Sequence, residues 1–180
     1  MPTSSSSVSP VALPSASESP VSGFYKTTDL ADAFAVALPD NATGDPESLA
    51  RFLFAQQPAW VPPLMSVRDA MVAGFGLKTA KHLASPAAAT VPRVGLFRIY
   101  ETRSHEIILG EDDKHLDFRV SVLVAPGAAG GGARRLVVST VVQCHNLLGR
   151  SYLRLIAPFH RQVVQGHLRR AVLAGWPKQA

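Results

Sequence analysis

Apolar and polar side chains alternate strictly over HLDFRVSVLV, residues 115–124. Alternation of this length predicts a β-strand with one buried face, because successive side chains of a strand point to opposite sides. The apolar set consists of Leu116, Phe118, Val120, Val122 and Val124. The polar set consists of His115, Asp117, Arg119 and Ser121. The strand therefore carries its charged and histidine side chains together on one face.

A second strand is predicted over LVVSTVVQCH, residues 136–145, after a glycine-rich loop. A hairpin with Val124 opposite Leu136 places His115 opposite His145 and brings the polar sets of both strands to one side. A slip of one residue would separate the polar sets, whereas the long loop leaves a slip of two residues open.

The pattern before this hairpin predicts one short strand and two short helices. The strand lies around residues 33–38, before a proline. The first helix opens at Asp45 with Pro46 behind it and ends near Pro58. A second helix is predicted over about residues 62–76.

Two further strands and a long helix complete the predicted elements. Residues 94–110 favour two strands joined by a turn near Arg103. Residues 151–174 follow helical spacing and predict a helix that begins at Ser151 and ends at Gly175. Pro158 predicts either a kink in this helix or its true start. The order of elements favours an α+β, helix-grip-like fold in which a curved antiparallel sheet packs around a long C-terminal helix.

Composition fits one domain of ordinary size. The 180 residues are 47% hydrophobic, and residues 1–22 are rich in Ser, Pro and Ala. We expect a disordered tail over residues 1–22 and a single domain over residues 23–177. No apolar run approaches the length of a membrane span, and residues 1–22 lack the pattern of a secretory signal. A cytoplasmic protein is therefore expected, in which the lone Cys144 is a buried small hydrophobe.

Charge is distributed unevenly along the chain. All thirteen acidic residues lie at or before Asp117, whereas the last 63 residues carry nine Lys and Arg residues. This distribution indicates either a surface for an anionic partner or pairing with the acidic first half on folding. Nucleic acid is not expected as a partner, because neither interleaved aromatic residues nor a recognisable module accompanies the arginines.

Several stretches of the sequence resemble the bacterial domain-of-unknown-function family 2867. They are DAFAVALP, LMSVRDAMVAGFGL, VGLF, LGEDDKHLDFRVSV, VVSTVVQCHNLLGR and YLRLIAPFHRQVV, and DDKHLDFR and PFHR are the most specific. The resemblance covers roughly residues 25–173 and implies kinship with the START-like, Bet v 1-like superfamily, whose members bind hydrophobic or amphipathic ligands. Some relatives are fused to a dehydrogenase-like domain, but this chain has no GxGxxG, so no cofactor is predicted.

His115, Asp117 and His145 are the candidate catalytic residues. Two histidines and one carboxylate have the residue types of a zinc or non-haem iron site, although no metal is predicted here. The same three groups could act as acid, orienter and base in a cyclase or dehydratase. The alternatives are a polar ligand-binding cluster and an exposed face on which Asp117 pairs with His115, His145 or Arg119.

His160, Arg119 and Arg150 are the candidate ligand-binding residues. They would fix the polar end of a hydrophobic or amphipathic small molecule, including an anionic one, in a pocket between the sheet and the C-terminal helix. The preferred prediction is such a binding module without defined catalysis. The alternatives are the enzyme described above and an accessory domain for a partner oxidoreductase.

Overall fold

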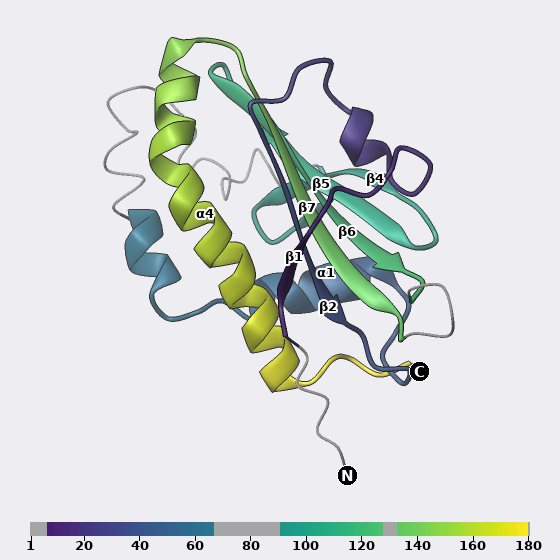
Figure 1. The fold of residues 1–180 in the computed structure, drawn as a ribbon. Helices are drawn as coiled ribbons and strands as arrows, with labels where there is room; N and C mark the ends of the chain where they lie inside the picture. The colour runs from purple at the N-terminus through teal and green to yellow at the C-terminus, as the bar shows by residue number, and fades with distance from the viewer. Residues whose placement is uncertain (1–6, 67–90, 128–132, 180) are drawn as a thin grey trace.

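The computed structural model describes residues 7–66, 91–127 and 133–179. It is an α+β fold in which seven strands form one curved antiparallel sheet, in the order β1-β2-β7-β6-β5-β4-β3 (Figure 1). The strands are β1 (Ser9–Val11), β2 (Leu30–Ala37), β3 (Arg93–Val94), β4 (Phe97–Thr102), β5 (Glu106–Asp112), β6 (Leu116–Ala125) and β7 (Arg135–Cys144). The helices are the 3-10 turn η1 (Pro20–Gly23), α1 (Pro46–Ala55) and the long α4 (Leu147–Ala174).

The β6–β7 hairpin has the predicted register. Val124 lies opposite Leu136, and Leu116 lies opposite Cys144. The backbone N–H of His145 donates to the carbonyl of His115 over 2.9 Å. Neither a one-residue nor a two-residue slip occurs, so the polar sets of the two strands share one side of the sheet.

The main apolar core lies between the sheet and the two helices. Helix α4 contacts β2 and β7, whereas α1 contacts β3, β5 and β6. Figure 1 shows α4 running beside the sheet and α1 lying across one end of it. The core includes Phe34, Val36, Leu49, Leu53, Ile107, Leu109, Val122, Leu136, Val138 and Leu168. Burial of these side chains is the main stabilising term, and it fills the space under the C-terminal half of α4.

The N-terminal segment lies across the opposite side of the sheet, which we call the outer face. Strand β1 pairs with Ala33, Phe34 and Ala35 of β2, and η1 contacts β6 and β7. Ser19 and Val21 are buried there. Within the segment predicted as a tail, the structure thus places a short strand and a 3-10 turn, held by two buried side chains and three strand pairs. The apolar residues of this segment are scattered in the sequence, so their pattern does not predict these contacts.

Helix α1 forms as the sequence predicts. The side chain of Asp45 accepts a hydrogen bond from the backbone N–H of Ser48 (2.8 Å), and Pro46 occupies the first turn. Arg51 and Glu47 form an ion pair one turn apart on the exposed face. Residues 61–66 are helical as well, but the predicted continuation to residue 76 lies outside the described residues.

Helix α4 begins four residues earlier than the predicted Ser151. The side chain of Asn146 caps the helix by accepting from the backbone N–H of Gly149 over 3.0 Å. A Cβ atom on Gly149 would lie 2.2 Å from the carbonyl oxygen of His115, so only glycine allows this close approach between helix and hairpin. The helix runs through Pro158 without a break. No helix among the described residues is long and apolar enough to cross a membrane.

Candidate functional site

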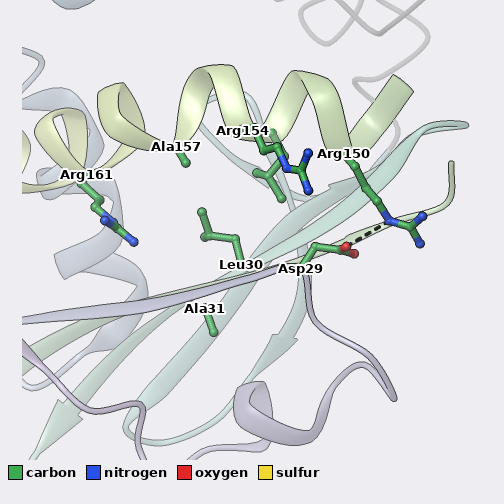
Figure 2. Close-up of a pocket in the computed structure, with 8 residues that line it drawn as sticks. Asp29, Leu30, Ala31, Arg150, Arg154, Ala157 and Arg161 are labelled. Carbon is green, nitrogen blue, oxygen red and sulfur yellow. Dashed lines mark hydrogen bonds and ion pairs between the residues drawn. The ribbon is translucent and has the colours of Figure 1, made fainter. Parts of the chain in front are cut away.

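A cleft lies between β2 and the N-terminal half of α4 (Figure 2). Its volume is about 430 Å³. The cleft is lined by Asp29, Leu30, Ala31, Arg150, Leu153, Arg154, Ala157 and Arg161. The lining thus combines apolar side chains with three arginines, which is a composition suited to an amphipathic anion.

The three arginines of the cleft share one stripe of α4. Positions 150, 154 and 161 are four and seven residues apart, a spacing that places side chains on the same side of a helix. Figure 2 shows all three extending from α4 toward β2. Strand β1 pairs with β2 only at Ala33, Phe34 and Ala35, so in the described part of the chain Leu30 and Ala31 have no strand neighbour from β1. The cleft occupies the space beside this end of β2.

The arginines of the cleft differ in how they are paired. Nε of Arg150 lies 3.3 Å from Oδ1 of Asp29, whose other oxygen accepts from the backbone N–H of Cys144 over 2.7 Å. Nε of Arg161 lies 3.6 Å from Oδ2 of Asp32. Arg154 is exposed and forms no hydrogen bond or ion pair with any other described residue. Arg154 is therefore the arginine of the cleft that has no carboxylate partner within the described residues.

Asp32 is a buried carboxylate on the helix side of the sheet. It follows Leu30 and precedes Phe34 in the alternation of β2, and its side chain is 11% exposed. Nε2 of His160, on α4, lies 3.5 Å from Oδ1 of Asp32. Neither oxygen of Asp32 nor Nε2 of His160 has a hydrogen-bond partner among the described protein atoms, although all three are closed to solvent. The two side chains are close, but their hydrogen-bonding capacity is not used.

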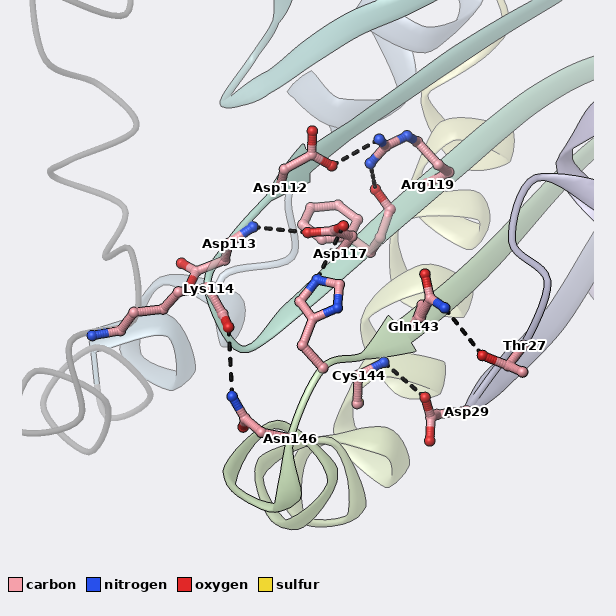
Figure 3. Close-up of polar contacts among 12 residues, drawn as sticks. Thr27, Asp29, Asp112, Asp113, Lys114, Asp117, Arg119, Gln143, Cys144 and Asn146 are labelled. Atoms are coloured by element: carbon pink, nitrogen blue, oxygen red, sulfur yellow. Dashed lines mark hydrogen bonds and ion pairs between the residues drawn. The ribbon is translucent and has the colours of Figure 1, made fainter.

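We call His115, Asp117, Arg119 and His145 the outer-face cluster, of which Figure 3 labels Asp117 and Arg119. Nε2 of His145 lies 3.1 Å from Oδ2 of Asp117, and the other carboxylate oxygen accepts from the backbone N–H of Asp113 over 3.0 Å. Nδ1 of His115 lies 3.0 Å from the side-chain nitrogen of Asn146, the residue that caps α4. Each of these contacts joins the polar groups of the hairpin to each other or to the start of α4.

Arg119 is almost completely buried on the outer face, at 5% exposure. One guanidinium nitrogen donates to Oδ1 of Asp112 over 2.7 Å, and another donates to the carbonyl of Phe118 over 2.8 Å. The guanidinium carbon lies 3.6 Å from the ring centroid of Tyr100 and 4.7 Å from that of Phe24. Stacking between aromatic rings and pairing with a carboxylate give this arginine a structural role.

The electrostatics around Arg119 agree with this role. Burial raises the pKa of Tyr100 to about 12, and the hydrogen bond from its hydroxyl to Asp112 (2.7 Å) acts in the same direction. Burial opposes ionisation of Asp112, but hydrogen bonds from Tyr100 and Arg119 outweigh it and lower the pKa of this carboxyl. The hydroxyl thus stays protonated and the carboxylate stays charged, as the network requires.

A second buried polar group lies on the outer face beneath the N-terminal segment. Glu106 is buried, and the hydroxyls of Ser19 and Ser121 both donate to its Oε1 over 2.5 Å. Ser19 comes from the N-terminal segment, whereas Ser121 comes from β6. The N-terminal segment therefore supplies one of the two hydroxyl groups that donate to this buried carboxylate.

The predicted site residues fall into two separate places. His115, Asp117, Arg119 and His145 do come together, but none of them lines the cleft between β2 and α4. Arg150 lines the cleft, and His160 faces Asp32 beside it. Arg119 is thus separated from the other two predicted ligand-binding residues by the sheet. Within the described ranges, no group of three His, Cys, Asp or Glu side chains is arranged to hold a metal ion.

Asp32, Arg154 and Arg161 were not among the predicted site residues. The predicted first strand began at residue 33, one position after Asp32, so the acid was not placed on a face. Extending the alternation backward from Phe34 to Leu30 would have shown one acid among the apolar positions of a strand. Cys144 is buried as predicted, and burial raises the pKa of its thiol to about 11.

The fold and the cleft define an α+β domain with an arginine-lined groove beside its C-terminal helix. The model of DUF2867, a family described as proteins of unknown function, matches residues 24–167, and the chain belongs to this family. The match confirms the family resemblance of the sequence motifs. No curated protein and no solved structure matches the chain.

Proposed function

We propose that this chain is a binding module for an amphipathic small molecule with an anionic group, held in the cleft between β2 and α4. The observation that carries the proposal is the state of Arg154. This arginine lies in the cleft between two arginines that have carboxylate partners, yet it has none within the described residues. A ligand carboxylate or phosphate would complete the pairing of charges there.

The apolar part of the lining supports an amphipathic ligand over a simple inorganic anion. Leu30, Leu153 and Ala157 contribute hydrocarbon surface to the same cleft as the arginines. Apolar ligand surface removed from water against these side chains contributes roughly 25 cal/mol per Å². The anion fixes the orientation of the ligand, whereas the hydrocarbon part provides most of the affinity.

Kinship with the START-like, helix-grip superfamily belongs to this proposal. The curved antiparallel sheet and the long C-terminal helix support it. In that architecture a ligand lies between the sheet and the helix, as it would here. The core under the C-terminal half of α4 is filled, so the proposed site is confined to the N-terminal half of the helix.

Two measurements test the binding function. Native mass spectrometry of freshly purified protein should show a mass above that of the polypeptide, from a retained small molecule. After such a molecule has been removed, decanoate should bind to the protein in isothermal titration calorimetry. Arg154→Gln should weaken decanoate binding about tenfold, because it removes the unpaired cation.

Arg170→Gln is the matched control for the decanoate experiment. Arg170 is exposed on the same helix and does not line the cleft. It should leave the affinity for decanoate unchanged. Equal weakening by both substitutions would mean that the ligand responds only to the net charge of the protein, and the proposed site would be rejected.

The enzyme and accessory-domain hypotheses have less support. Acid–base chemistry by His115, Asp117 and His145 would need substrate access on the outer face, where Asp117 and His145 bind each other. An accessory role predicts that an oxidoreductase copurifies with the chain. Retention of a nucleotide-binding protein in a pulldown, lost on mutation of an outer-face residue, would favour that role over small-molecule binding.

A further inference from the structure

We propose that Asp32 and His160 form a hydroxyl-binding subsite at the inner end of the cleft, so that the ligand is a medium-chain hydroxy acid. This inference rests on the proposed function, because it assigns a second polar group to the same ligand. Its starting point is the pair of unsatisfied atoms, Oδ1 of Asp32 and Nε2 of His160, 3.5 Å apart and closed to solvent.

The burial of Asp32 without a hydrogen bond is energetically unfavourable in the free protein. A buried polar group that loses its water without gaining a donor destabilises the fold, and a charged group does so more strongly. His160 is too far from Asp32 for a good hydrogen bond, and Arg161 is 59% exposed, so its attraction is screened by solvent. A ligand donor that binds Asp32 would therefore gain more binding free energy than a donor that binds a carboxylate whose oxygens already accept hydrogen bonds.

A hydroxyl group fits the two unsatisfied atoms together. It donates one hydrogen bond, which the Asp32 carboxylate accepts, and its oxygen accepts one, which the N–H of a suitably protonated His160 donates. An ammonium group has no acceptor for His160, and a second carboxylate would be repelled by Asp32. The chemistry of the pair therefore selects a hydroxyl.

Arg161 connects this subsite to the cleft. It lines the cleft, and its Nε lies 3.6 Å from Oδ2 of Asp32 without a hydrogen bond. A long, largely exposed side chain can change rotamer at low cost. Rotation of Arg161 would open Asp32 to a ligand that already occupies the cleft.

The position of the subsite sets the length of the ligand. Arg154 and His160 are six residues apart on α4, which corresponds to about 9 Å along the helix axis, a span that an extended chain of about eight to ten carbons covers. A carboxylate on Arg154 and a hydroxyl at Asp32 would thus be at opposite ends of such a chain, with its hydrocarbon part between Leu153 and Ala157 on one side and β2 on the other.

The test compares decanoate with 10-hydroxydecanoate by isothermal titration calorimetry. The wild-type protein should bind the hydroxy acid about tenfold more tightly, because the terminal hydroxyl bonds to a charged group. Asp32→Leu should reverse this preference, since the hydroxyl would then be buried without a partner. His160→Phe should reduce the preference as well.

Asp32→Asn is the second variant, because it keeps the size of the side chain if the leucine is not tolerated. It should reduce the preference by severalfold. A preference that persists in both Asp32 variants would overturn the subsite. Arg154-dependent binding of decanoate with no preference for the hydroxy acid would overturn the subsite and leave the proposed function standing. Failure of both acids to bind the wild-type protein would reject the proposed function itself.

Discussion

The aspartates on the two sides of the sheet differ in their hydrogen bonds, although the outer face also contains buried atoms without a partner, such as Nε of Arg119 and Oε2 of Glu106. On the outer face, Asp117 pairs with His145, and Arg119 pairs with Asp112 and stacks on Tyr100. On the helix side, Asp32 and His160 face each other without a hydrogen bond. Arg154, also on α4, has no partner in the described part of the chain.

This contrast separates a structural network from the proposed binding site. Polar groups that already satisfy each other hold the fold together and offer little to a ligand. Polar groups that lack partners cost stability in the free protein, and a ligand that supplies partners recovers that cost. Asp117 and Arg119, in the run of charged residues of β6, belong to the structural network. Asp32 of β2 belongs to the proposed binding site.

The largest loss of stability on the outer face is expected from adding a side chain at Gly110. A Cβ atom there would lie 2.2 Å from the carbonyl oxygen of Phe118 and 3.0 Å from Cδ of Arg119. Gly110→Ala should lower the free energy of unfolding by about 3 kcal/mol or more, because the backbone of β5 or β6 must shift. Urea unfolding followed by circular dichroism measures this change.

Gly23→Ala is the control for Gly110→Ala. Nothing lies within 4 Å of a Cβ atom at Gly23, so the change should stay within about 0.5 kcal/mol. A loss at Gly110 no larger than the loss at Gly23 would show that β5 and β6 are not in close contact at this point.

Arg119 and Arg154 provide a direct comparison of the two sides. Arg119→Met should destabilise the protein by about 2–4 kcal/mol, because Asp112 loses its partner and the aromatic rings lose their stacked cation. Arg154→Met should change the unfolding free energy by less than about 0.5 kcal/mol. Chemical denaturation of the two variants side by side measures the difference, and similar losses would contradict the division into structural and binding arginines.

The N-terminal segment should stabilise the outer face through Ser19. Ser19→Ala removes one of the two hydroxyl donors to the buried Glu106 and should cost about 1–2 kcal/mol. Ser17→Ala is the matched control, since Ser17 is exposed and bonds only to another exposed serine among the described contacts. Thermal unfolding monitored by fluorescence checks both, and an equal, small effect would mean that the segment does not anchor to Glu106.

His167, on helix α4, is a buried titratable group that should sharpen the comparison through pH. Burial lowers the pKa of His167, although its Nδ1 bonds to the carbonyl of Val163 over 2.9 Å. The unfolded chain then binds a proton more readily than the folded protein, so the stability contributed by neutral His167 is lost as the pH falls below about 6.5.

His167→Gln should therefore reduce the loss of stability between pH 7.5 and pH 5.5 by about 1 kcal/mol or less. Urea titrations of wild type and variant at both pH values give the difference directly. Identical pH dependence in the two proteins would show that His167 takes up its proton equally in the folded and unfolded states.

The β6–β7 hairpin could be predicted from the sequence, whereas the partners of its polar face could not. Alternation along β6 and β7 determines which residues share a side, and the observed pairing of Val124 with Leu136 follows from it. Alternation does not say what covers each side. Arg119 finds Tyr100 and Phe24, which lie in a different strand and in the N-terminal segment.

The same limit explains why Asp32 was not predicted as a site residue, although a pocket between the sheet and the C-terminal helix was predicted. Asp32 and His160 are 128 positions apart in the chain, and only the packing of α4 on β2 brings them within 3.5 Å. Residues 151–174 were predicted to be helical, but helical spacing alone does not place Arg154 and Arg161 beside a cleft, because the polar side chains of a helix normally face solvent. Their position beside the end of β2 depends on the tertiary fold.

The most direct test of this division compares Asp32→Leu with Asp117→Leu in urea unfolding without ligand. Asp32→Leu should raise the free energy of unfolding by about 1 kcal/mol, because it removes a carboxylate whose buried oxygens lack hydrogen bonds, while its charged partner Arg161 is largely exposed to solvent. Asp117→Leu should lower it by about 1 kcal/mol, because His145 and the backbone of Asp113 lose their partner. Opposite signs would support the account, and a loss at Asp32 equal to that at Asp117 would contradict it.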